Sequence, residues 1–252
     1  MCSETVDQYC VMGEKAMPYL SKIDIEAIAN RIIDQYKLRY IPSKRLFYRV
    51  DPIELAEMLG LSVYFRQLSY DHSILGMTAP DEVMVPIFDE NKERSIFILD
   101  GKTVLIESCL NHSPKAKGRR NFTIAHECAH QILYRLYPKI YGPNQRVLCD
   151  YRRNNAPKRK IADWEEWQAD TLAAELLMPT FLINAEIERV ALTLPNGILY
   201  KSVSDPNYEK ILEMARRIGV SWSAIRIRLQ QMQVIKGKPI HCHPLDIMRF
   251  GE

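Results

Sequence analysis

The sequence predicts an α+β fold in which a small, mostly antiparallel sheet precedes a set of helices. Between residues 61 and 107, short runs rich in β-branched and aromatic side chains alternate with turn signals. Before and after this stretch, apolar residues recur at intervals of three and four, which is the spacing of amphipathic helices. The chain has 252 residues, 47% of them hydrophobic, and is therefore long enough to bury a substantial core.

The N-terminal part is predicted to be a tail followed by a helix. Residues 1–19 show no clear periodicity and are assigned to the tail. Residues 21–40 have helical spacing, with Ser21 as a possible N-cap and Asp24 three residues later. The predicted inward face of this helix consists of Ile23, Ala27, Ile28, Ile32 and Tyr36.

A short helix and four strands are predicted next. Asp51-Pro52 marks the start of the helix and Gly60 its end, because an acidic cap with an early proline favours a helix start and glycine favours an exit. The strands are predicted at residues 61–65, 83–85, 95–99 and 103–106. Asp100-Gly101 lies between the last two strands and is a hairpin signal. An edge of such a sheet can pair with an extended peptide, although the sheet can equally serve only as core.

The segment from Arg119 to Tyr134 contains H-E-C-A-H, an instance of H-E-x-x-H, within a helical apolar pattern. On a helix, His126 and His130 lie one turn apart on the same face, so they can bring two imidazole nitrogens to one metal ion. Glu127 lies about 100° around the helix from His126. It therefore borders the metal without joining the pair, where a carboxylate can accept a proton from water.

A hydrolytic zinc site needs a third protein ligand, and Glu166 is predicted to supply it from a second amphipathic helix. Asp170 follows Glu166 by one helical turn and could accept the N–H of a ligand histidine. Glu165 is an alternative ligand, but Glu166 is preferred because of its spacing to Asp170. Small residues would let the two helices approach closely, namely Ala169, Ala173 and Ala174.

Cysteine usage and segment composition predict a cytoplasmic protein. The six cysteines include no C-x-x-C pair, which argues against a disulfide framework and against a thiolate zinc site. Reduced thiols are expected inside the cell, and the sequence contains neither a signal-peptide pattern nor an apolar run of membrane-spanning length. The formal net charge of +3 is too small to imply a partner by itself.

The C-terminal part is predicted to be helical. Residues 205–218 form one predicted helix, and a glycine-containing turn with Ser221 as cap leads into a second helix that reaches Met232. This is the pattern of a helix-turn-helix, in which Arg226 and Arg228 could contact the phosphates of DNA. The alternative, slightly favoured because few basic residues would face DNA, is a plain helical pair that packs on the rest of the chain.

Three motifs together resemble the ImmA/IrrE family of zinc metallopeptidases. They are FTIAHECAH at residues 122–130, EWQAD at residues 166–170 and AAELLMP at residues 173–179. The resemblance covers roughly residues 20–235 and implies a zincin-like peptidase domain at residues 20–184. A helical, helix-turn-helix-like region would then occupy residues 185–252.

The resemblance also implies a site and a function. A gluzincin-like site would hold zinc on His126, His130 and Glu166, with Glu127 as general base, although such ligands also accept other first-row metals. Members of this family are intracellular and make a limited cut in a transcriptional repressor, which switches on mobile-element or stress-response genes. The expected partner is therefore a helix-turn-helix repressor as protein substrate. The alternative function is a DNA- or repressor-binding regulatory protein whose metal is structural and which performs no proteolysis.

Overall fold

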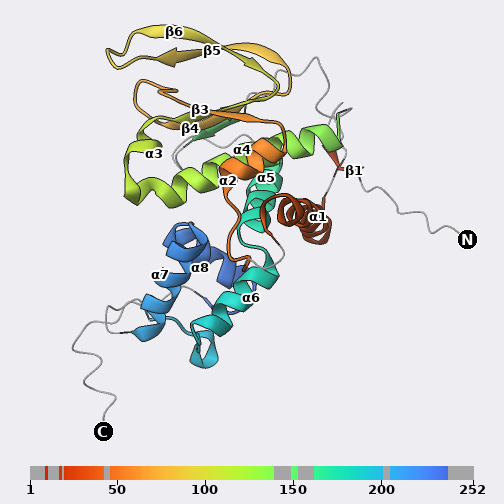
Figure 1. Ribbon diagram of the computed structural model, residues 1–252, viewed down its shortest axis with the longest axis vertical. Helices are drawn as coiled ribbons and strands as arrows, with labels where there is room; N and C mark the ends of the chain where they lie inside the picture. The colour runs from red at the N-terminus through yellow and green to blue at the C-terminus, as the bar shows by residue number, and fades with distance from the viewer. Residues whose placement is uncertain are drawn as a thin grey trace, which may run out of the picture.

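The computed structural model describes residues 20–42, 46–138, 162–200 and 205–237, together with the backbone of residues 9–10, 17–18 and 149–152. Most of the predicted N-terminal tail lies outside the described residues, but β1 (Tyr9–Cys10) and β2 (Met17–Pro18) pair antiparallel within it. Strands gather at one end of the molecule, a layer of helices crosses beneath them, and the C-terminal helices lie at the other end (Figure 1). The predicted α+β class is confirmed.

Helix α1 (Lys22–Tyr40) begins as predicted but presents a different face to the core. Ser21 and Asp24 form the predicted capping box. The prediction of the inward face was wrong for Ile23, which is 78% exposed, and for Ala27, which is also exposed. The other three predicted residues contact the core, namely Ile28, Ile32 and Tyr36. The buried residues of the helix are Ile25, Ala29, Ile33 and Tyr36. Isoleucines occur on several sides of this helix, and its packing against α5 (Ala162–Leu177) selects one of two apolar faces.

Helix α2 (Pro52–Met58) has the predicted ends. The Asp51 carboxylate accepts a hydrogen bond from the Ile53 amide at 3.0 Å, and Pro52 occupies the first turn. Gly60 leaves the helix with a φ of +70°, a conformation that glycine adopts without strain.

The main sheet has four strands in the order β3 (Ser62–Arg66), β7 (Thr103–Glu107), β4 (Ile74–Thr78) and β8 (Cys149–Arg152). β3 and β7 are parallel, and the other two pairs are antiparallel. A separate antiparallel ribbon consists of β5 (Glu82–Phe88) and β6 (Arg94–Asp100). The expectation of a small, mostly antiparallel sheet is therefore confirmed.

Two details of the strand prediction differ from the structure. The prediction of a hairpin at Asp100-Gly101 was wrong, because β6 pairs with β5 whereas β7 pairs with β3 and β4. At this point the chain turns from the ribbon into the main sheet, and Gly101 has a φ of +74° directly against the Pro80 carbonyl. Strand β4 was not predicted, although its residues 74–78 form a short apolar run next to turn residues.

Helices cover one face of the main sheet. Helix α4 (Lys117–Leu136) contacts β4, β7 and β8 on one side and α2 and α5 on others (Figure 1). It follows the short helix α3 (Cys109–His112) and the 3-10 turn η1 (Pro114–Ala116). After α5 come α6 (Thr180–Arg189), the 3-10 turn η2 (Pro195–Gly197), α7 (Pro206–Ile218) and α8 (Trp222–Gln231). Among the described residues, none of the helices combines the length and apolarity that crossing a bilayer requires.

The α7–α8 pair is joined by the predicted turn, and that turn lies on α4. Gly219 ends α7 in a left-handed conformation, and the Ser221 hydroxyl accepts the Ala224 amide at the start of α8. The Asn121 side chain of α4 donates to the Gly219 carbonyl at 2.8 Å. A Cβ added to Gly118 of α4 would lie 2.4 Å from the Ser221 nitrogen, so only glycine allows this approach.

One hydrophobic core contains residues between Leu20 and Ile235. It therefore includes side chains from the predicted peptidase domain and from the predicted C-terminal helical region. The predicted boundary between residues 184 and 185 falls inside α6. The division into two regions stays a prediction, and the part of it beyond residue 237 lies outside the described residues.

Arg228 is buried at 5% exposure, so the prediction that it could contact DNA phosphates was wrong. Its guanidinium makes two hydrogen bonds of 2.5 Å to the Glu175 carboxylate and one of 2.9 Å to the Met178 carbonyl. Burial raises the pKa of Glu175 even though the charge of Arg228 opposes this effect. The pair therefore ties α8 to the end of α5, in agreement with the plain helical pair as the favoured alternative.

Replacing Arg228 by Met should lower the free energy of unfolding by about 3–5 kcal/mol, because Glu175 would lose its cation while staying buried. Urea unfolding monitored by circular dichroism measures this loss. Arg226→Met on the same helix is the matched control, and its effect should stay within about 0.5 kcal/mol because Arg226 is only half-buried. Equal losses in the two variants would contradict the role assigned to the buried pair.

Candidate metal centre

Helix α4 holds the H-E-x-x-H residues in its most enclosed part. His126 and Glu127 are 0% exposed and His130 is 6% exposed. Every residue of α4 from Thr123 to Leu133 is buried, because the sheet covers one side of the helix and α2 and α5 cover others. Burial of three ionisable side chains in one stretch is unfavourable unless partners offset it. The helix therefore requires polar partners from a neighbouring element.

Helix α5 supplies those partners. The Nε2 atoms of His126 and His130 lie 3.0 Å apart. Glu166 approaches both, with distances of 3.2 Å from Oε2 to His126 Nε2 and 3.5 Å from Oε1 to His130 Nε2. Four ligands at zinc distances of 2.0–2.2 Å in a tetrahedron would be separated by about 3.3 Å. The three side chains therefore fit one zinc-sized cation, with His126, His130 and Glu166 as the set of donors.

Asp170 orients the first histidine. Its Oδ1 atom accepts a hydrogen bond from Nδ1 of His126 at 2.9 Å. With the proton on Nδ1, the Nε2 atom of His126 presents a lone pair toward Glu166 and His130. Asp170 stands one turn after Glu166 on α5, as the sequence spacing predicted. A carboxylate at this position fixes the tautomer of the histidine, as is typical beside a metal ligand.

The electrostatic balance of the site favours a positive charge. Burial lowers the pKa of His126, but hydrogen bonds to Asp170 and Glu166 outweigh burial and raise this pKa to about 10. Burial lowers the pKa of His130. Burial raises the pKa of Glu166, yet the contacts with the two histidines dominate and lower it well below its usual range. The surroundings of His126 thus favour a positive charge, which a cation bound at Nε2 would supply in place of a second proton.

Glu127 lies beside the donor set and against the sheet. A Cβ added to Gly76 of β4 would lie 2.5 Å from Oε1 of Glu127 and 2.6 Å from Cγ2 of Thr123. Only a glycine permits this close approach of strand and helix. At the end of the strand, Gln131 of α4 donates to the Thr78 hydroxyl at 2.8 Å and to the Ala79 carbonyl at 2.7 Å. These contacts fix the position of β4 against α4 next to Glu127.

The structure brings together the residues predicted from the sequence. Glu166 rather than Glu165 approaches the histidines within the described residues, which favours the preferred ligand. Ala169 and Ala173 are fully buried in α5, and Ala174 is half-buried. Sequence reasoning missed Gly76, whose only signal is a glycine inside an apolar run. The metal-ligand and catalytic roles themselves stay predictions.

An H-E-x-x-H helix completed by a carboxylate from a second helix, beneath a small sheet, defines a metallopeptidase-like class of domain. Residues 109–230 match the family Peptidase_M78, described as the IrrE N-terminal-like domain. Over this region the match supports the resemblance to the ImmA/IrrE family that the motifs predicted.

A solved structure with a similar course of chain is a transcriptional regulator from Mycobacterium tuberculosis, which is 17% identical with a TM-score of 0.43. The match covers 82% of this chain and 47% of that chain, so this chain spans about half the length of that regulator. No curated protein matches the sequence.

Gly76→Ala should cost about 1–3 kcal/mol of stability, because the added methyl group overpacks the contact with Glu127 and Thr123. Zinc stoichiometry should be unchanged, since the substitution touches no donor atom. Urea unfolding and elemental analysis measure the two quantities. In a Glu127→Ala background, the cost of Gly76→Ala should fall by at least about 0.5 kcal/mol. Strict additivity of the two substitutions would contradict the contact.

Proposed function

We propose that this protein is a cytoplasmic zinc-dependent endopeptidase that makes a limited, site-specific cut in a transcriptional repressor and so derepresses mobile-element or stress-response genes. The observation that carries the proposal is the convergence of two buried Nε2 atoms and the Glu166 carboxylate, 3.0–3.5 Å apart, beside the buried Glu127. A structural metal would need no enclosed carboxylate next to a three-ligand set. A hydrolytic site needs one.

The proposed roles follow from position. His126, His130 and Glu166 hold the zinc ion, and Asp170 keeps the His126 ring in the tautomer that offers Nε2. When bound, zinc acts as a Lewis acid that polarises the scissile carbonyl and lowers the pKa of water. Glu127 accepts the proton of the attacking water and returns it to the leaving nitrogen. Its burial and the contact with Gly76 limit the directions in which its carboxylate can move.

The sheet suggests where the substrate is bound. β4 and β7 have neighbours on both sides, so the edges of the described four-stranded sheet are β3 and β8. β8 contacts α4, whereas β3 lies at the opposite edge with two strands between them. An extended peptide that adds to the outer side of β8 would therefore run along the helix of the proposed metal ligands. Main-chain pairing of this kind tolerates varied side chains.

The proposal that the substrate is a repressor rests on the family resemblance. The α7–α8 pair supports a role within the peptidase body rather than DNA binding by this chain, because Arg228 is paired with Glu175 and Arg217 with Glu186. Both guanidinium groups are thereby paired with carboxylates of this chain, and that of Arg228 is buried. A helix-turn-helix repressor encoded by a neighbouring gene is the first substrate to test.

Glu127→Gln should bind zinc as the native protein does but cut the repressor at least about 100- to 10,000-fold more slowly, because the amide cannot accept the proton. Intact-mass measurement after incubation with the repressor detects the cut, and elemental analysis measures the zinc. Glu165→Gln is the matched control on α5, and its cleavage should be unchanged. Cleavage by Glu127→Gln at the native rate would refute the assignment of the base. Native protein that binds the repressor without cutting it would favour the non-proteolytic alternative.

The inactive Glu127→Gln chain also tests the proposed edge. When it is mixed with uncut repressor, hydrogen exchange of the amides at residues 149–152 should slow, because their outer side would pair with the peptide. The amides of β3 at residues 62–66 should exchange as before and provide the internal comparison. Mass spectrometry of peptic fragments measures both. Protection confined to β3 would show that the substrate lies at the other edge.

A further inference from the structure

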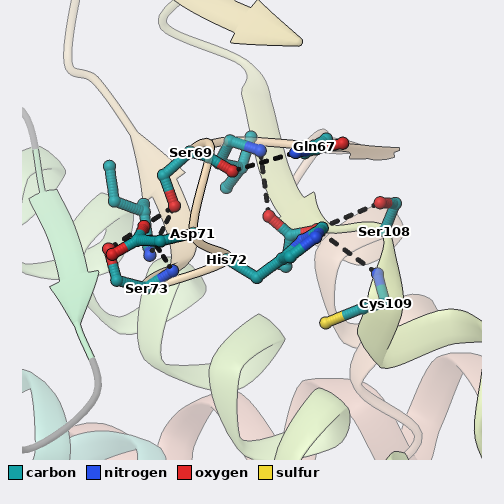
Figure 2. Close-up of polar contacts among 10 residues, drawn as sticks. Gln67, Ser69, Asp71, His72, Ser73, Ser108 and Cys109 are labelled. Atoms are coloured by element: carbon teal, nitrogen blue, oxygen red, sulfur yellow. Dashed lines mark hydrogen bonds and ion pairs between the residues drawn. The ribbon is translucent and has the colours of Figure 1, made fainter. Parts of the chain in front are cut away.

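A second cluster of metal-binding side chains lies outside the H-E-x-x-H site. His72 comes from the loop between β3 and β4, Glu107 is the last residue of β7, and Cys109 is the first residue of α3. Figure 2 shows His72 and Cys109 close to one another where this loop meets the start of α3. One donor atom from each, a ring nitrogen, a carboxylate oxygen and a thiol sulfur, lies within 4.8 Å of the other two.

The loop that carries His72 is built to direct this side chain. His72 has a φ of +55°, a left-handed conformation that costs a residue with a Cβ about 1–2 kcal/mol. Hydrogen bonds within the loop enforce it: the His72 amide donates to the Ser69 carbonyl at 3.2 Å and the Ser73 amide to Asp71 Oδ1 at 3.1 Å. The Ile74 amide donates to Ser69 Oγ at 3.2 Å. Strain that is held by surrounding bonds often marks a binding position.

Glu107 supplies a buried carboxylate. Its side chain is 0% exposed, and Oε2 accepts the Leu68 amide at 2.9 Å. Oε1 lies 3.1 Å from His72 Nδ1 and accepts the Ser108 hydroxyl at 3.0 Å and the Cys109 amide at 3.3 Å. Neutral donors thus hold both carboxylate oxygens, and Oε1 also faces the imidazole. His72 is 40% exposed, so water can reach the cluster.

We propose that His72, Glu107 and Cys109 bind a second divalent transition-metal ion, with zinc as the natural candidate. A set of one nitrogen, one oxygen and one sulfur donor suits zinc or cobalt, whereas a thiolate is a poor ligand for magnesium or calcium. Two of the three residues, His72 and Glu107, precede the region that matches the family, residues 109–230. The site therefore does not follow from family membership.

Metal binding at this position has a definite proton balance. The Cys109 thiol loses its proton to solvent and binds as thiolate. His72 binds through Nδ1 as neutral imidazole with its proton on Nε2, and Glu107 exchanges its contact with His72 for the metal. Water fills the remaining vertex of the tetrahedron. The ion then links the loop before β4 to β7 and to α3, and so stiffens the strand that carries Gly76.

Cobalt(II) titration of the full chain tests the proposal, because cobalt bound by thiolate has a near-ultraviolet charge-transfer band that a site of histidine and carboxylate lacks. We expect two equivalents of cobalt to bind, one of them with this band, and zinc to abolish the band by displacement. Cys109→Ser and His72→Asn should each reduce the stoichiometry from two to one, and Cys109→Ser should remove the band. Circular dichroism should show that both variants stay folded.

Two control variants separate this site from the others. His112→Asn removes an exposed histidine at the end of α3 and should leave both the band and the stoichiometry unchanged. His126→Ala should lose the equivalent without thiolate and keep the band, so the outcome is independent of the proposed peptidase site. Absence of the band from the cobalt-loaded native chain, or a band that survives Cys109→Ser, would overturn the proposal. His72 and Glu107 would then form only a hydrogen bond.

Discussion

The enclosure of the middle of α4, from Thr123 to Leu133, is the constraint on which the rest of the structure depends. A helix surrounded by sheet and helices normally carries only apolar residues, yet this one buries two histidines and Glu127 in its middle. Helix α5 resolves the conflict because it brings Glu166 and Asp170 to the histidines. Buried alanines on α5 allow the close approach. The polar centre and the packing of the two helices therefore exist only together.

Local patterns predicted which residues converge at the candidate site, because these residues recur at helical spacing. His126, His130, Glu166 and Asp170 each lie one turn from a partner on the same helix, and spacing along one helix survives folding. Caps and glycine exits were predictable for the same reason, as the ends of α1, α2, α7 and α8 illustrate. The family motifs lie in α4, in α5 and at the end of α5.

Features that depend on distant parts of the chain could not be predicted. The core face of α1 is selected by α5, which lies more than a hundred residues further along. Strand pairing also depends on distant residues. The predicted turn at Asp100-Gly101 is present, but it connects the β5–β6 ribbon to the main sheet and does not form a hairpin. From the sequence, Arg228 was interpreted as a solvent-facing cation, because its partner Glu175 lies on a different helix. His72, Glu107 and Cys109 share no periodic spacing, and only the sheet brings them together.

The donor set is divided between α4 and α5, and the connection between them includes β8. A chain in which α5 has not yet docked on α4 has only two of the three donors, the two histidines, and two imidazoles bind zinc poorly. Under the proposed function, capture of the cation would require that folding has finished. A peptidase assembled in this manner would stay silent during synthesis and after partial unfolding, so immature or damaged copies would cut nothing.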